Sequence, residues 1–275
     1  MTAIIDRGTT RDGLIQLRRR WQPSGVARAS VLLIHGLGEH CGRYERVGDR
    51  LAAAGFDVVS IDNRGCGESG GVRAHVDSWD EYLDDIEDQL AELRTLDLPV
   101  VLIGHSLGGL MATTYCASDR PKPDAVVVSG PALGVDLRTK DKIMSFVGRF
   151  IRKVAPRFEV VDDFDATVFA EDVTVGEKFL TDPLRSGFMT ISLALETQGA
   201  MAKANAAVNS LGLAVLALHG GRDKIVPPWA SEPFENAPGA TRVVYPELGH
   251  EVFNEPVGME LVDSVVEWIE STLDV

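Results

Sequence analysis

Apolar runs recur along the chain and are separated by polar or mixed stretches. Seven such runs, many of them β-branched, lie at residues 14–17, 31–34, 58–61, 100–103, 125–128, 214–218 and 243–245. Most of them are uniformly apolar rather than alternating, which is typical of strands that are covered on both faces. The pattern therefore predicts a sheet that is buried on both sides.

Helical patterns lie between these runs. They span residues 44–54, 79–96, 107–117 and 256–273, and a further helix is predicted from residue 228. Strands that alternate with helices predict an α/β fold with a mostly parallel central sheet and right-handed crossovers. Ligands of such sheets gather at the carboxyl ends of the strands. Residues that directly follow a strand are therefore the first candidates for chemistry.

The alternation breaks between residues 131 and 210. A stretch of this length is too long for a structureless loop in a compact domain, so we expect it to carry its own helices. It is predicted to form a lid over the carboxyl ends of the strands, while residues 1–130 and 211–275 form the core. Apolar positions around residues 188–195 either line a pocket for an acyl chain or form the core of the lid.

The first part of the predicted lid is basic. Residues 139–158 contain six basic residues and one acidic residue, Asp141, and apolar positions recur there at helical spacing. A basic amphipathic helix at residues 140–157 can dock transiently on an anionic lipid surface. The alternative, a lid helix that packs on the core and leaves a solvated basic face, is the more common arrangement and is favoured.

Composition narrows the class of protein. The 275 residues are 45% hydrophobic and 25% charged, as in a globular domain. The formal net charge of −14 speaks against nucleic-acid binding. The N-terminus carries no apolar stretch of signal-peptide length, so we expect a cytoplasmic protein. Three widely spaced cysteines favour neither a disulfide framework nor a zinc site.

Ser106 is the candidate nucleophile. It is the centre of Gly-His-Ser-Leu-Gly at residues 104–108, which directly follows an apolar run and opens a helical pattern. A serine on such a strand-to-helix turn is held in a strained conformation that exposes its hydroxyl group. A chain of this length shows the five-residue pattern by chance on the order of one time in ten. Its interpretation therefore depends on a base, an orienting acid and an oxyanion hole elsewhere in the chain.

Asp223 and His250 are the candidate acid and base. Each lies in a loop that follows one of the last two apolar runs. A lone aspartate can cap a helix, and a lone histidine is more often structural than catalytic. Together with Ser106, however, they give the chain order Ser, Asp, His that is expected of a nucleophile turn on an α/β sheet. The sequence therefore predicts a catalytic triad.

The loop after the second apolar run is a candidate oxyanion hole. It reads His-Gly-Leu-Gly-Glu-His at residues 35–40, and its glycines let backbone N–H groups approach a ligand closely. We expect the N–H of Leu37 to act together with that of Leu107. Alternatively, the motif is only a tight turn.

A second glycine-rich loop follows the third apolar run, at residues 62–71. Its glycines suit a phosphate-binding loop, but it has neither Gly-Lys-Ser/Thr nor a Gly-x-Gly-x-x-Gly that opens a helix. We therefore expect a well-bonded turn behind the active site.

These motifs together resemble the α/β-hydrolase fold, and more narrowly the serine hydrolases of the monoacylglycerol lipase and lysophospholipase type. The matching stretches are residues 35–44, 62–69, 104–109, 182–184, 219–223 and 249–250. The resemblance implies the triad, an oxyanion hole at Leu37 and Leu107, a lid between the sixth and seventh strands, and a monoacylglycerol substrate.

Two positions differ from this family pattern. Such enzymes can carry a tyrosine shortly before Asp-Pro-Leu and a polar residue shortly after the catalytic histidine, where a glycerol head group is bound. This chain has Phe179 and Phe253 at those places. Either other groups bind the glycerol hydroxyls, with Glu39 or Arg43 as the candidates, or the pocket prefers a less polar alcohol.

The sequence thus predicts a serine esterase that acts on a small-molecule ester or lipid and needs no metal or organic cofactor. A general carboxylesterase or lysophospholipase is the main alternative, and a thioesterase, peptidase or perhydrolase would use much the same residues. A minor alternative is a non-catalytic protein that has the hydrolase fold and binds an apolar ligand. The oligomeric state stays open.

Overall fold

The structure, a computed structural model, describes residues 3–136 and 139–275, and it describes side chains outside residues 137–146. Its central sheet has eight strands in the order β1-β2-β4-β3-β5-β6-β9-β10. The strands are β1 (Ile4–Thr9), β2 (Ile15–Trp21), β3 (Ala29–Ile34), β4 (Phe56–Ile61), β5 (Val100–His105), β6 (Ala125–Ser129), β9 (Ala214–Gly220) and β10 (Ala240–Tyr245). From β4 to β10 all neighbours are parallel, whereas β2 is antiparallel to both β1 and β4.

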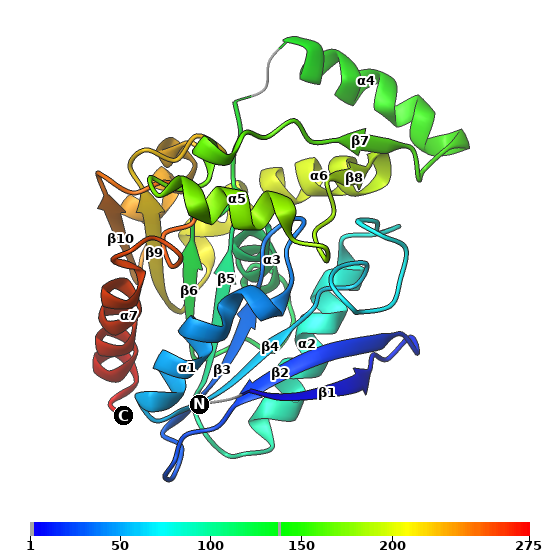
Figure 1. The fold of residues 1–275 in the computed structure, drawn as a ribbon. Helices are drawn as coiled ribbons and strands as arrows, with labels where there is room; N and C mark the ends of the chain where they lie inside the picture. Colours follow the sequence, from blue (N-terminus) through cyan, green and yellow to red (C-terminus); the bar gives the residue numbers. More distant parts are fainter. Residues whose placement is uncertain (1–2, 137–138) are drawn as a thin grey trace.

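Helices cover both faces of this sheet (Figure 1). The flanking helices are α1 (Glu45–Ala53), α2 (Asp80–Arg94), α3 (Leu107–Cys116) and α7 (Gly258–Leu273). Alternate strand residues enter two separate cores, so that Leu32 of β3 packs in the core with α2 and α3, and Leu33 in the core with α1 and α7. Burial on both faces explains why the strand sequences are uniformly apolar.

The predicted mostly parallel α/β fold is confirmed, and each of the seven predicted runs overlaps a strand. Strand β1 was not predicted, because its sequence mixes apolar and charged residues and most of it is exposed at the sheet edge, where it pairs with β2 alone. The helix predicted from residue 228 is a 3₁₀ helix, η4 (Pro228–Glu235). Pro233 inside it lacks the N–H that an α-helix would use.

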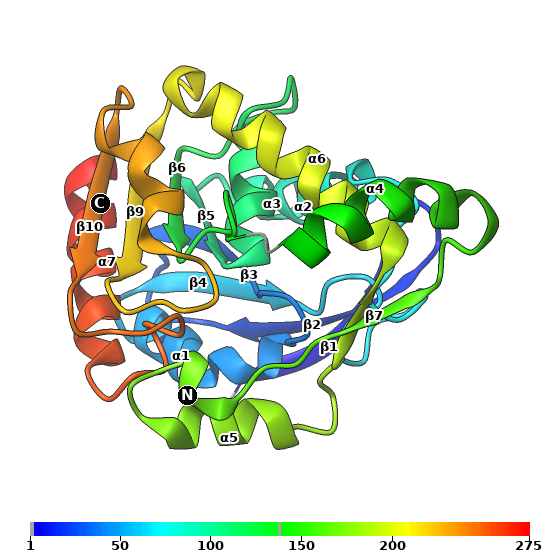
Figure 2. The ribbon, with the colours of Figure 1, turned by 90° about the horizontal axis from the view of Figure 1, so that it is seen from above.

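Residues 131–210 lie between β6 and β9 and are called the cap segment below. They contain α4 (Thr139–Val154), β7 (Glu159–Val161), η2 (Ala166–Val168), α5 (Val173–Thr181), β8 (Phe188–Thr190), α6 (Ile191–Ala207) and η3 (Val208–Ser210). Figure 1 shows α4, α5, β7 and β8 beyond the carboxyl ends of β5 and β6, and Figure 2 shows α4 beside α6. The two short strands pair antiparallel. Three residues each are too few to give a strand pattern in the sequence.

Glycines allow β3, β5 and α3 to approach one another at the turn after β5. A Cβ atom on Gly104 would lie 2.3 Å from the carbonyl oxygen of Gly108. A Cβ on Gly108 would in turn lie 2.3 Å from the carbonyl oxygen of Ile34. Because these neighbours are backbone atoms, no side-chain rotation relieves either contact.

We therefore expect Gly108→Ala to destabilise the fold, although alanine is the better helix former. The added Cβ atom would force the backbones apart. This should lower the free energy of unfolding by about 1–3 kcal/mol, as overpacking commonly does. Gly199→Ala is the matched control, since Gly199 also lies in a helix, α6, and its added Cβ would meet nothing within 4 Å. Urea unfolding measures both; a Gly108→Ala protein as stable as the parent would contradict the steric argument.

Candidate active site

Ser106 lies on the turn that joins β5 to α3. Its backbone angles are φ 53° and ψ −115°, a conformation that a non-glycine residue adopts only under strain. The surrounding backbone holds this conformation in place. The N–H of Ser106 donates to the carbonyl of Ser129 at 2.8 Å, and its own carbonyl accepts from the N–H groups of Leu110 and Ala132 at 3.1 Å each.

Asp223 and His250 form a buried pair at the ends of β9 and β10. His250 Nδ1 lies 2.6 Å from Asp223 Oδ2. The other carboxylate oxygen accepts the N–H groups of Ile225 and Val226 at 2.9 and 2.8 Å, which fixes the orientation of the carboxylate. His219 Nε2 lies 3.3 Å from Oδ2 on the same carboxylate. The aspartate is thus positioned to orient the imidazole.

Electrostatics favours an ionised aspartate beside a basic histidine. Burial opposes ionisation of Asp223, but the nearby His250, with hydrogen bonds from His219 and His250, holds the pKa of this carboxyl well below its usual range. Burial also opposes a charge on His250, but Asp223 outweighs it and raises the pKa of the imidazole. The pair is therefore suited to accept a proton at His250.

A cavity of about 530 Å³ joins the candidate residues. This volume is within the range of roughly 300–1,000 Å³ that small-molecule pockets span. Ser106, Asp223 and His250 line it together with Leu37, Leu107 and Glu39. The other lining residues are mostly apolar and include Val135, Phe164, Phe169, Phe179, Met189, Met201, Ile225 and Val226.

Ser106 and His250 share this cavity without a direct hydrogen bond between their side chains, as far as the described residues go. Catalytic hydrogen bonds are often long in ligand-free sites and tighten when substrate binds. The arrangement is therefore compatible with proton transfer from Ser106 to His250.

The loop after β3 approaches Ser106 closely. A Cβ atom on Gly36 would lie 3.1 Å from the Cβ of Ser106, so only a residue without a side chain fits there comfortably. Within the part of the chain that the structure describes, the backbone N–H groups of Leu37 and Leu107 have no protein acceptor. Both residues line the cavity. The two donors are thus available to a ligand, as an oxyanion hole requires.

The loop at residues 62–71 is a hydrogen-bonded turn, as predicted. The carboxylate of Asp62 accepts the N–H groups of Cys41 and Glu68, both at 2.8 Å, and its carbonyl accepts the hydroxyl of Ser69. Because Cys41 begins the short helix η1 (Cys41–Tyr44), these bonds tie the two glycine-rich loops together.

Phe179 of α5 lies on the cavity wall between two guanidinium groups. Arg43 and Arg185 each lie 4.9 Å from the centroid of its ring. A cation near the face of an aromatic ring is attracted to the ring electrons, so both guanidinium groups help to hold the Phe179 ring in place. Arg43, which was predicted to bind substrate, is not among the residues that line the cavity.

Phe253 is not placed at the cavity. Its side chain is buried in the core that also contains residues of α1 and α7, and it is not among the residues that line the cavity. The expectation that it faces the head group of the substrate therefore differs from the structure. The chain bends after His250, with the N–H of Val252 bonded to the carbonyl of His250, so position in sequence after the histidine does not imply position in the cavity.

Two buried glutamates lie beside Arg43 at the edge of the cavity. Glu39 Oε2 lies 3.6 Å from Arg43 Nε, and Glu251 Oε2 lies 3.4 Å from Arg43 Nη2. Burial and the charge of Glu251 raise the pKa of Glu39 to about 8. Burial disfavours the charge on Glu251 as well, but Arg43 and the neighbouring histidines lower its pKa to about 2.

Glu39 was among the residues predicted from the sequence, whereas Glu251 was not. Glu251 directly follows the candidate catalytic histidine, and that position was the available signal.

Glu255 links the loop of His250 to the cap segment. Its fully buried carboxylate accepts the N–H of Gly249 at 3.0 Å and the N–H of Glu171 at 2.8 Å. The other oxygen lies 3.4 Å from the N–H of Asp172, which caps α5. One side chain thus holds the residue before His250 and the start of a cap helix.

The fold and the serine turn define the class of protein. A mostly parallel sheet with helices on both faces, a serine on the turn after β5, and a later Asp–His pair are the features of serine hydrolases with the α/β-hydrolase fold.

Comparison with known proteins agrees with this class. Residues 25–257 match the family model described as "Serine aminopeptidase, S33". A monoacylglycerol lipase of Mycolicibacterium smegmatis is 33% identical over 260 residues, which cover 92% of each chain. Phospholipase YtpA of Bacillus subtilis is 28% identical over 233 residues, and the aligned region covers 83% of this chain and 90% of the phospholipase. The crystal structure of a monoacylglycerol lipase from Paleococcus ferrophilus superposes with a TM-score of 0.84 at 30% identity, covering 93% of this chain and 98% of that one.

The chain therefore belongs to the serine aminopeptidase S33 family of α/β-hydrolases, in a part of it that includes monoacylglycerol lipases.

Proposed function

We propose that the chain is a serine esterase that hydrolyses monoacylglycerols through Ser106, His250 and Asp223. The observation that carries the proposal is the placement of these three side chains on one largely apolar cavity. The similar monoacylglycerol lipases support the choice of substrate.

The proposed reaction begins with attack of Ser106 Oγ on the ester carbonyl. His250 Nε2 accepts the hydroxyl proton, and Asp223 holds the imidazole and stabilises the imidazolium that forms. The N–H groups of Leu37 and Leu107 donate to the developing oxyanion. Leu107 is the first residue of α3, so the positive end of the helix dipole adds to its effect.

Breakdown of the tetrahedral intermediate releases the alcohol. His250 gives its proton to the leaving glycerol oxygen, and the acyl group remains on Ser106 as an ester. Water then attacks this ester, His250 accepts its proton, and the free fatty acid leaves with Ser106 restored. No cofactor takes part in this proposed sequence.

The cavity has two chemically different parts that fit the two parts of a monoacylglycerol. Apolar side chains of the cap segment, such as Phe169, Phe179 and Met201, suit the acyl chain. Glu39 is the polar side chain suited to the glycerol hydroxyls, with Arg43 orienting it from behind. In this proposal the cap segment, residues 131–210, acts as the lid of the cavity.

A lysophospholipid is the second candidate substrate. It shares the single acyl chain of a monoacylglycerol, and a phospholipase is among the similar proteins. Its charged head group would have to lie beside Glu39 and Glu251, which favours the uncharged glycerol ester.

Replacement of the proposed nucleophile tests the mechanism. We expect Ser106→Ala to lower kcat for a short-chain nitrophenyl ester by about 10⁴-fold or more, since loss of a triad member commonly has an effect of this size. Ser30→Ala is the matched control: Ser30 is also fully buried, and its hydroxyl has no hydrogen-bond partner among the described residues. Equal activity of both variants would exclude Ser106 as the nucleophile.

A panel of purified esters tests the substrate. We expect kcat/KM to be highest for a long-chain 1-monoacylglycerol, because both parts of the cavity are then filled. Lysophosphatidylcholine, a diacylglycerol, a triacylglycerol and short nitrophenyl esters should give lower values. A higher kcat/KM for lysophosphatidylcholine would instead support the second candidate.

We further propose that α4 brings the enzyme to anionic lipid surfaces. No helix among the described residues is long and apolar enough to span a membrane. Phe150 and Val154 are, however, 61% and 85% exposed, and Arg149 and Lys153 lie on the same helix. Arg152 does not belong to this face, because it forms an ion pair with Glu196 at 2.8 Å. The side chains of Lys140 and Lys142 are outside the described residues.

Vesicle flotation tests this part of the proposal. Phe150→Ser with Val154→Ser, and separately Arg149→Glu with Lys153→Glu, should each reduce the fraction bound to phosphatidylglycerol vesicles several-fold. Arg46→Glu with Lys203→Glu is the control of equal charge change, at exposed positions on α1 and α6. If both α4 variants bind like the control, α4 has no role at the lipid surface.

A further inference from the structure

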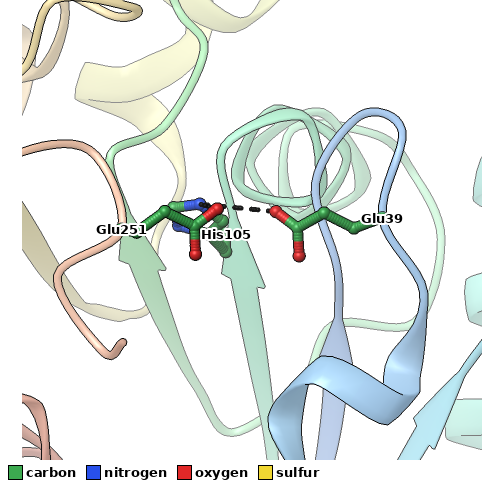
Figure 3. A group of neighbouring side chains, drawn as sticks. All are labelled: Glu39, His105 and Glu251. Carbon is green, nitrogen blue, oxygen red and sulfur yellow. Dashed lines mark ion pairs between the residues drawn. The ribbon is translucent and has the colours of Figure 1, made fainter. Parts of the chain in front are cut away.

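Three buried side chains from separate parts of the chain converge beside the candidate triad (Figure 3). Glu39 lies in the loop after β3, His105 ends β5, and Glu251 follows His250. His105 Nε2 lies 3.8 Å from Oε1 of Glu39 and 3.8 Å from Oε1 of Glu251. The three atoms all lie within 4.8 Å of one another, and no other group of this kind occurs among the described residues.

His105 Nε2 has no hydrogen-bond partner among the described residues, although its side chain is only 3% exposed. At 3.8 Å the two carboxylate oxygens are too far for hydrogen bonds. The other ring nitrogen, Nδ1, lies 3.3 Å from the hydroxyl of Ser129. When Nδ1 carries the proton, a nitrogen lone pair and two carboxylate oxygens face one another across a shared space.

Arg43 does not fill that space. It approaches the Oε2 atoms of Glu39 and Glu251, at 3.6 and 3.4 Å, whereas the Oε1 atoms face His105. One guanidinium group balances one of the two carboxylates. The inner side of the cluster therefore presents three ligand atoms and, with both carboxylates ionised, one uncompensated negative charge.

We propose that Glu39 Oε1, His105 Nε2 and Glu251 Oε1 bind a divalent transition-metal ion of the zinc type. One imidazole nitrogen with two carboxylate oxygens suits such an ion better than Ca²⁺ or Mg²⁺, which prefer oxygen ligands alone. Tetrahedral bonds of about 2.0–2.2 Å place ligand atoms roughly 3.4 Å apart. To close the site, each oxygen must approach His105 Nε2 from 3.8 Å by about 0.4 Å, and the atoms that are now up to 4.8 Å apart must approach by up to about 1.4 Å. The two glutamates line the cavity, which gives the ion a route of entry.

The bound ion acts as an inhibitor. Glu39 and Glu251 line the same cavity as Ser106 and His250. An ion bound by Glu39 Oε1 holds this side chain at the cluster and so removes it from the glycerol head group. This inhibition rests on the proposed function, whereas ion binding itself does not.

Binding is measured on the full chain after treatment with a chelator. Isothermal titration with ZnCl₂ should give one ion per chain, and CaCl₂ and MgCl₂ should give no comparable heat. Co²⁺ should show the strong visible absorption of a tetrahedral site. We expect Glu39→Gln and Glu251→Gln each to weaken Zn²⁺ binding by at least about tenfold. Loss of a residue that only hydrogen-bonds to a metal ligand already lowers metal affinity by about 10- to 100-fold, and loss of a ligand should do no less. Glu267→Gln, an exposed position on α7, is the matched control and should bind like the parent.

Two further measurements keep the outcomes distinct. Unfolding curves show whether each variant is folded, and the Co²⁺ spectrum of the parent tests the site without any variant. Ser106→Ala, which is inactive in the proposed function, should still bind one Zn²⁺. Absence of saturable Zn²⁺ binding by the parent, or equal binding by the parent and both folded glutamine variants, would overturn the site. Stoichiometric binding without loss of esterase activity would overturn the inhibition.

Discussion

The close backbone contact among β3, β5 and α3 is the constraint on which the candidate site depends. Gly104 and Gly108 remove the two Cβ atoms that would meet carbonyl oxygens at 2.3 Å. The chain can therefore reverse direction sharply at Ser106, whose positive φ is held by hydrogen bonds from neighbouring segments. The same contact brings the loop with Leu37 next to Ser106. One backbone packing arrangement thus positions both the candidate nucleophile and the candidate oxyanion donors.

The sequence predicted most of the central sheet because burial on both faces leaves a uniform apolar signal. Three strands were not predicted, because this signal is weak in them. Strand β1 is an exposed edge strand, and β7 and β8 are only three residues long. That Ser106, Asp223 and His250 line one cavity was predictable for a related reason. Ser106, Asp223 and His250 each follow a recognisable strand, and parallel strands bring their carboxyl ends together.

Residues around the triad were harder to predict because their positions depend on how loops turn. Phe179 lies on the cavity wall with two arginines near its ring, whereas Phe253 is buried in the core. His105 and Glu251 were passed over, although each is adjacent to a triad residue in sequence. Their proximity to Glu39 joins the end of β5 to two loops, and no local pattern in a single sequence encodes such a contact.

The buried carboxylate of Glu255 has a mechanical consequence. It binds the N–H groups of Gly249 and Glu171 at once, so the α5 end of the cap segment is anchored to the loop that carries His250. Separating the two would strand a charged acceptor away from water, which is energetically unfavourable. Any movement that parts α5 from the loop of His250 must therefore break these hydrogen bonds. The geometry of the candidate catalytic histidine is thus coupled to the packing of one cap helix.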